Sequence, residues 1–485
     1  MKYTLLSFLG VLILATVIDR ISRRPDNADR PVLYWVTDTS ASRQAEIELF
    51  YTWLEEKGYP QFEIRLDSTN KDVSKKLIQG ISGVGADLIS MARDEAWLLH
   101  ATGMMEDLLP LATKHGFTVD KAWPAISDQF LIDGQQVGFP RGSPVQAYLV
   151  NLELLETFDQ PIPSRRWTIE EFEAAGKAFM AAANTGDSRQ KVFFCDLVNI
   201  LTLRRSMGRS MYNETMTRCT LDNAEGARAL RLLYQWIYED RILPTQADLD
   251  FFAGNDTNTS RIQLFKQGRY ALLTAARYSL VQMRDGPAMR MVARVSAHAG
   301  FPNGLIGTGS IGIYAKSEHK ELAAYLLEFF ASETYNMSVV RSSDSMPPVP
   351  EYTATEEYLR PVDYPGEWGV HEEMADLMEI AIPPSVSPFA LPSSANRIER
   401  EFRYAVLASV YSPEEGAALT EKFINREIDL NVSKNPQLQR KHARLLEDQA
   451  TIDRLRAAGE PVPLELIANP FYRVYYVAQG WAAES

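Results

Sequence analysis

Residues 31–92 alternate between strand-like and helix-like segments, and this order constrains the fold more than any other feature of the sequence. The strand-like segments, PVLYWVT, FEIRLDS and ADLISMA, are rich in β-branched and aromatic side chains. The first helix-like segment is residues 43–57, where apolar residues follow helical spacing, and the second is Val73–Ile81. Because a β-α-β-α order favours parallel strands covered by helices, the sequence predicts an α/β fold with a parallel sheet.

Later segments predict a second lobe. The chain has 485 residues, which is enough for two large lobes. Pro140, Gly142 and Pro144 interrupt the segment VGFPRGSPVQAYLVN, which we interpret as the first crossing between lobes. Beyond it, Thr168 and Glu171 form a capping box, and the following region is rich in helical patterns. We expect LIGTGSIGIYAKS to form one glycine-punctuated strand and HKELAAYLLEFFAS an amphipathic helix.

The composition argues against several classes of function. A net charge of −13 provides no basic surface for nucleic acid, so no nucleic-acid partner is expected. The six histidines lack the short spacings that place two imidazoles on one metal ion, and we expect neither a metal site nor a cofactor. Cys195 and Cys219 allow either one disulfide or two buried thiols.

The amino terminus has the layout of an export signal. Met1 and Lys2 precede the apolar run Tyr3–Ile18, after which charged residues follow at once. Small residues typical of a cleavage site are poorly represented there, and the segment contains no cysteine for lipid attachment. We therefore expect residues 1–24 to be an uncleaved signal anchor in the cytoplasmic membrane, with a cleaved signal peptide as the alternative.

Several segments between about residues 30 and 432 follow the order and spacing of one protein family. They are an opening strand with Trp35, ADLISMARDEAWLLHATGMMEDLLPL, GFPRGSPVQAYLVNLELLE, RRWTIEEFEAAGKAF, FKQGRYALLTAARYSL and GTGSIGIYAKSEHKELAAYLLEFFAS. Together they resemble the family 1 extracellular solute-binding proteins, the sugar-type receptors of ABC importers. The chain departs from that family at Val150 and Asn151, where a Tyr-Asn pair is usual, and in its long carboxyl tail.

The resemblance implies an α/β, two-lobed clamp of the periplasmic-binding-protein type (type II), which closes on a solute by bending at a hinge between the lobes. We expect an N-terminal lobe of residues 30–145 with part of 280–350, and a mainly helical C-terminal lobe of residues 146–280 and 350–432. Residues 433–485 then form a helical extension. This extension either packs on the C-terminal lobe or lies against a membrane surface or a permease.

The resemblance also implies that loops at strand ends hold the ligand. A saccharide needs aromatic rings against its C–H faces and polar side chains around its hydroxyls. Asp94 matches a hydroxyl-binding carboxylate of the family, and Tyr278 occupies a turn that often carries a stacking aromatic ring. We expect ligand contacts from these two residues and from Trp35, Thr37, Asp38, Arg93, Arg141, Gln146, Arg277, Ser310 and Trp368. Each has a structural alternative, such as a helix cap for Asp38 and Asp94 or core packing for Tyr278.

The function that the resemblance implies is an extracytoplasmic receptor that captures a saccharide or saccharide derivative and delivers it to an ABC transporter permease. No enzymatic activity is expected. Two alternatives stay open: a sensory module that signals ligand occupancy to a membrane partner, and a carbohydrate hydrolase. The hydrolase would pair Asp94 or Glu95 with a second carboxylate such as Glu367 or Glu372.

Overall fold

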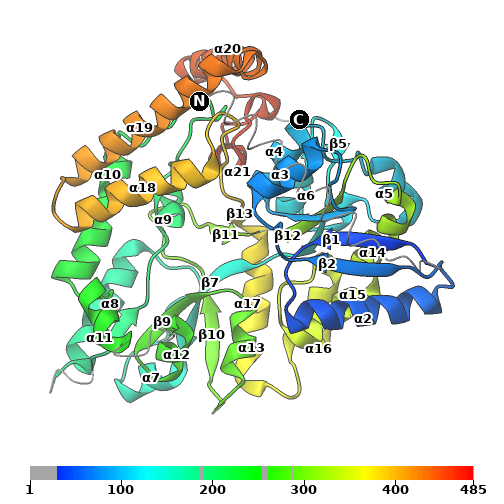
Figure 1. Cartoon of the computed structure of the whole chain (residues 1–485). Coiled ribbons are helices and arrows are strands. Elements are labelled where there is room, and N and C mark those ends of the chain that lie inside the picture. Colours follow the sequence, from blue (N-terminus) through cyan, green and yellow to red (C-terminus); the bar gives the residue numbers. More distant parts are fainter. Residues whose placement is uncertain (1–29, 186–190, 254–259, 287, 308, 484–485) are drawn as a thin grey trace. The chain divides into compact units, whose positions relative to one another are not determined.

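The computed structural model describes residues 30–483, apart from 186–190, 254–259, 287 and 308. The described chain forms two compact units, which are considered separately below (Figure 1). Unit 1 comprises the residues up to Ser143 together with Gly307–Thr355, and unit 2 comprises Pro144–Ile306 and the residues from Glu356 onward. The first passage between units falls inside the proline- and glycine-rich segment GFPRGSP. The predicted signal anchor, residues 1–24, lies outside the described residues.

The sheet of unit 1 has the strand order β2-β1-β3-β12-β6. Strand β1 pairs in parallel with β2 and β3, whereas β12 runs antiparallel to β3 and β6. The parallel pairing predicted from residues 31–92 is therefore confirmed for β1, β2 and β3. The sheet as a whole is mixed, because β12 enters from a distant part of the chain in the opposite direction. The elements of unit 1 are β1 (Val32–Val36), α2 (Ala41–Glu56), β2 (Glu63–Asp67), α3 (Val73–Ile81), β3 (Leu88–Met91), α4 (Arg93–Ala101), α5 (Leu109–His115), α6 (Pro124–Phe130), β4 (Leu131–Ile132), β5 (Gln135–Gln136), β6 (Phe139–Gly142), β12 (Gly309–Ile313), α14 (Lys320–Ala331) and α15 (Glu333–Ser342).

Aromatic side chains form the core of unit 1. Phe50 and Trp53 of α2 contact Phe329 of α14, with ring centroids 5.5 Å apart in both pairs. Trp35 of β1 packs on Phe330 of α14 in the same buried cluster, with ring centroids 6.3 Å apart. Since α2 and α14 are distant in sequence, this cluster joins the two chain segments of unit 1.

The sheet of unit 2 has the order β13-β11-β7-β9-β8, and β10 also pairs with β7. The segment LIGTGSIGIYAKS is two strands rather than the single strand expected, because the chain leaves unit 2 after Ile306. Its first part, β11, pairs with β7 and β13, and its second part is β12 of unit 1. The elements of unit 2 up to β11 are β7 (Val145–Asn151), α7 (Leu152–Thr157), α8 (Ile169–Ala183), β8 (Phe193–Cys195), α9 (Ile200–Ser206), α10 (Ala224–Tyr234), α11 (Gln246–Ala253), α12 (Arg261–Lys266), β9 (Tyr270–Ala275), α13 (Ser279–Met283), β10 (Met291–Arg294) and β11 (Gly304–Ile306).

Helices dominate the rest of unit 2. They are α16 (Glu356–Leu359), α17 (Trp368–Glu379), α18 (Pro392–Leu407), α19 (Pro413–Lys434), α20 (Pro436–Ala458) and α21 (Pro470–Gln479), with β13 (Ala381–Ile382) between α17 and α18. The predicted capping box at α8 is present, because Thr168 and Glu171 exchange side-chain and backbone hydrogen bonds. Cys195 and Cys219 are both buried free thiols.

The C-terminal extension, residues 433–485, is packed into unit 2 in its described part. Its aromatic residue Phe471 meets Phe301, with ring centroids 5.8 Å apart. The carboxylate of Glu214 accepts hydrogen bonds from three side chains of the extension: Tyr476, Gln449 and Arg456. These contacts support the packed alternative for the extension over a free tail.

Candidate functional site

In unit 1, an ion-pair network joins two of the predicted site residues, Asp38 and Arg141. Arg43 of α2 contacts Asp38 at 3.3 Å and Glu46 at 2.6 Å, and Arg141 of β6 contacts the other oxygen of Glu46 at 3.1 Å. Burial alone would raise the pKa of Asp38, but hydrogen bonds from Ser40 and the charge of Arg43 hold it well below its usual range. Asp38 is therefore ionised and half-exposed, ready to accept hydrogen bonds.

The N-cap of α2 is Ser40 and not Asp38, for which a capping role was the predicted alternative. Ser40 is the N-cap of α2 and accepts from the backbone N–H of Arg43, while Asp38 accepts from the backbone N–H of Ser40 at 3.1 Å. Asp38 thus holds the capping residue in place and still has accessible surface.

Three other predicted contacts in unit 1 are buried. Trp35 is fully buried, and its indole N–H donates to Ser90 at 2.9 Å. Ser310 donates to the carbonyl of Met91, and its side chain is enclosed between strands. Thr37 is also buried, next to Asp67, whose carbonyl accepts from its backbone N–H. In this structure these residues serve the core of unit 1.

Arg93 and Asp94 are the first two residues of α4, directly after β3. Their side chains lie outside what the structure describes. The position before them, Ala92, is the N-cap, and its backbone N–H donates to the carboxylate of Glu95. Glu95 also forms an ion pair with Lys76 at 2.8 Å, and this pair anchors the start of α4 in unit 1.

In unit 2, a buried polar cluster forms around Arg277. Its Nε atom donates to Nδ1 of His371 at 3.2 Å, and its guanidinium lies 4.6 Å from the ring centroid of Tyr358. Burial lowers the pKa of Arg277 to about 10. Nε2 of His371 lies 3.3 Å from Glu367, which also makes a two-point ion pair with Arg284. Burial would raise the pKa of Glu367, but its contacts with His371 and Arg284 lower it.

Two exposed aromatic residues flank this cluster. Tyr278 follows Arg277 at the start of α13, and Trp368 follows Glu367 at the start of α17. Both are 45% exposed. The Trp368 indole N–H donates to the carbonyl of Pro361 at 3.0 Å, which orients the ring. The Arg277–His371 contact therefore ties together the two chain segments that present these rings.

Gln146 lies on β7 and accepts a hydrogen bond from the side chain of Asn199 at 3.0 Å. Nearby, Asn199 also caps α9, so Gln146 helps to hold the start of that helix. Among the described residues, no group of histidine, cysteine, aspartate or glutamate side chains is arranged to hold a metal ion. No helix within the described part of the chain is both long and apolar enough to cross a membrane.

Sequence reasoning missed the residues that support the predicted ones. Arg43 and Glu46 were not selected, although their i,i+3 spacing on a helix is a signal for an ion pair. Arg284 and Tyr358, which enclose the Arg277 cluster, give no local signal. Their contacts join residues far apart in the sequence.

Each unit has an α/β fold, and each holds some of the predicted site residues in accessible positions. A profile of the family described as "Bacterial extracellular solute-binding protein" matches residues 55–366. The chain belongs to this bacterial extracellular solute-binding family. Because the family is one of binding proteins, the chain is a solute-binding protein and not an enzyme.

Solved structures share the fold at low sequence identity. One is an ABC substrate-binding protein from Listeria monocytogenes in complex with cycloalternan, with 18% identity, a TM-score of 0.69 and coverage of 83% of this chain and 100% of that chain. Another is the sugar-binding protein MalE from Xanthomonas citri, with 12% identity, a TM-score of 0.66 and coverage of 82% and 97%. A third is a cyclic alpha-maltosyl-1,6-maltose binding protein from Arthrobacter globiformis, with 15% identity, a TM-score of 0.64 and coverage of 83% and 99%. No curated protein sequence matches the chain significantly.

Proposed function

We propose that this protein is an extracytoplasmic receptor that captures a saccharide or saccharide derivative and delivers it to an ABC transporter permease. Membership of the extracellular solute-binding family supports capture of a solute outside the cytoplasm. The proteins with the same fold include one bound to cycloalternan and one that binds a cyclic maltosyl-maltose, which supports a saccharide as the solute.

The observation that carries the proposal is the pair of half-exposed rings, Tyr278 and Trp368, set beside the polar cluster of Arg277, His371 and Glu367. Exposed rings supply a flat apolar face that suits the C–H surface of a sugar. In unit 1, Asp38 and Arg141 are the proposed hydrogen-bonding residues, since both retain accessible surface.

A thermal-shift panel tests this function. The purified protein is heated with neutral mono- and oligosaccharides, including cycloalternan, with acidic sugars, and with amino acids as a control class. A ligand that binds only the folded state raises the midpoint of unfolding with its concentration. We expect a shift for one saccharide class, with the sugar recovered chemically unchanged. Shifts confined to the amino acids would contradict the proposal, and recovery of a cleaved sugar would indicate a hydrolase.

We also propose that residues 1–24 tether the receptor to the cytoplasmic membrane as an uncleaved anchor. The support is the apolar run Tyr3–Ile18 followed by charged residues. Amino-terminal sequencing of the protein recovered from washed membranes tests this proposal. An intact terminus in the membrane fraction is expected, and a mature protein that begins after this run would contradict it.

A further inference from the structure

Unit 2 has a pocket of about 400 Å³ that has no part in the proposed function. Its volume lies in the range of roughly 300 to 1,000 Å³ that is usual for small-molecule sites. Seven residues line it: Arg165, Arg166, Val295, Glu373, Asp376, Leu377 and Ile380. Leu377 lies about 13 Å further along α17 than Trp368, given the rise of an α-helix. The pocket is therefore distinct from the exposed rings at the start of that helix.

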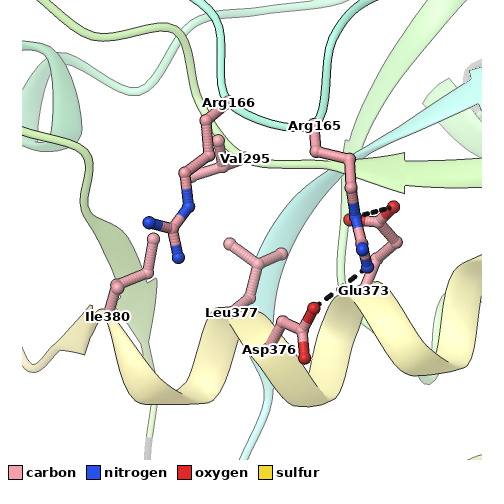
Figure 2. A pocket seen from close by; sticks show the side chains of 7 residues that line it. All are labelled: Arg165, Arg166, Val295, Glu373, Asp376, Leu377 and Ile380. Carbon is pink, nitrogen blue, oxygen red and sulfur yellow. Dashed lines mark hydrogen bonds and ion pairs between the residues drawn. The ribbon is translucent and has the colours of Figure 1, made fainter.

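The backbone around the pocket is fixed by buried contacts. Trp167 is buried, and its indole N–H donates to the carbonyl of Val295 at 2.8 Å. The backbone N–H of His298 donates to the carbonyl of Trp167 at 3.0 Å. These bonds hold the preceding residues, Arg165 and Arg166, at the edge of the sheet, and α17 provides the opposite wall (Figure 2).

The acidic residues of the pocket already have partners. Arg165 contacts Glu373 at 2.6 Å and Asp376 at 3.0 Å, as the dashed lines in Figure 2 show. Glu373 also forms an ion pair with a second arginine, Arg294, at 2.9 Å. Two carboxylates thus engage two guanidinium groups, and the remaining charged residue that lines the pocket, Arg166, carries an excess positive charge.

The side chain of Arg166 makes no hydrogen bond or ion pair with any residue that the structure describes. Figure 2 shows it extending toward Leu377 of α17 and toward Ile380, the C-cap residue of that helix. Two acidic residues that follow Arg166 closely in the sequence have other partners: Glu171 closes the cap of α8, and Glu170 lies 3.8 Å from Arg228. The pocket therefore places the guanidinium of Arg166 beside aliphatic side chains.

We propose that this pocket binds a small aliphatic carboxylate. The carboxylate group pairs with Arg166, whose planar fork matches its two oxygens. The alkyl chain lies against Val295, Leu377 and Ile380, of which Ile380 has the most accessible side chain. None of the residues that line the pocket is aromatic, so the pocket suits an alkyl chain better than a sugar ring. An amine is disfavoured because both carboxylates already face arginines.

Methyl-labelled NMR spectra of the full chain test this site, because its apolar wall consists of Val, Leu and Ile. Hexanoate is titrated, with hexanol and hexylamine of the same chain length as comparisons. We expect hexanoate alone to shift the methyl signals of Val295, Leu377 and Ile380, with a dissociation constant on the order of 1 mM for a solvent-accessible ion pair with a small apolar contact.

Arg166→Gln should weaken hexanoate binding at least fivefold, whereas Arg397→Gln, which changes an exposed arginine of the same unit, should leave it unchanged. Unchanged methyl signals elsewhere in unit 2 show that the Arg166→Gln variant is folded. The proposal fails if hexanoate causes no shifts at these methyl groups, if hexanol causes equal shifts, or if Arg166→Gln binds hexanoate as well as the original chain does. Because the test needs no saccharide, its outcome is independent of the proposed receptor function.

Discussion

Arg277 donates a hydrogen bond from Nε to Nδ1 of His371 over 3.2 Å, although 94 residues separate them in the chain. An arginine can only donate, so Nδ1 of His371 is unprotonated, and the neutral ring carries its proton on Nε2. Burial lowers the pKa of His371, and although Glu367 opposes this, the charges of Arg277 and Arg284 lower it further. This hydrogen bond links the turn that carries Tyr278 to α17, the helix that begins at Trp368.

Folding stability should therefore decrease as the pH falls from about 7.5 to about 5.5. In the unfolded chain the histidine has its ordinary pKa near 6.5, so below that pH the unfolded state binds a proton that folded His371 does not. His298, whose pKa burial also lowers, acts in the same direction. Urea unfolding at both pH values measures the loss.

The variant His371→Gln isolates the contribution of this residue, because its amide oxygen still accepts from Arg277 but does not titrate. We expect a smaller difference in unfolding free energy between the two pH values than in the original chain. His319→Gln, which changes a histidine at the start of α14 in unit 1, is the control. If the free energy of unfolding depends equally on pH in His371→Gln and in the original chain, His371 is not the source of the pH dependence.

The ion-pair network of unit 1 gives a second prediction. Glu46 faces both Arg43 and Arg141, and its side chain is only 9% exposed. Glu46→Gln should lower the free energy of unfolding by about 3 kcal/mol, because two arginines lose their shared carboxylate. The control is Glu63→Gln, which breaks an exposed pair with Arg65 and should cost less than about 1 kcal/mol. Equal losses from the two substitutions, measured by urea unfolding, would show that the network is not a buried one.

The C-terminal extension gives a third prediction through Asn469, which is fully buried. Its amide donates to Ser210 and to the carbonyls of Tyr212 and Asn213, and its oxygen accepts from Ser385. Asn469→Ala leaves these groups without a partner and should lower the free energy of unfolding by about 3 kcal/mol.

Gln479→Ala, at the exposed end of α21, is the matched control for Asn469→Ala and should have almost no effect. A chain that stops after residue 432 would lose the same contacts and should be far less resistant to proteolysis in unit 2. If the truncated chain unfolds like the full chain, the extension is an appendage and not a part of unit 2.

Much of the fold could be predicted because the signals are local. Val73–Ile81 begins and ends where its pattern predicts, and the Thr168–Glu171 capping box depends on residues three positions apart. The LIGTGSIGIYAKS segment was misjudged because β11 and β12 pair with strands far away in the sequence. Strand pairing depends on the tertiary fold, which periodicity does not encode.

The candidate site was predictable in type more than in detail. Tyr278 and Asp38, which follow strands, have accessible side chains, and their contact with a ligand stays a prediction. Trp35 was expected to contact the ligand but lies in the core, where Arg43 covers its ring at 5.0 Å. A strand sequence does not reveal which face a helix will cover, so burial of Trp35 could not be read from its own segment.

The most direct test of the receptor account is calorimetric titration of the purified protein with the saccharide that the thermal-shift panel identifies. Tyr278→Ala and Trp368→Ala should each weaken binding about tenfold, which corresponds to about 1.4 kcal/mol. Tyr404→Ala, which removes a ring of unit 2 that is 57% exposed, should bind as the original chain does. Saccharide binding that is lost in the first two variants and kept in the third is the predicted result. Binding that is unaffected by both substitutions, or no binding of any saccharide, would contradict the account.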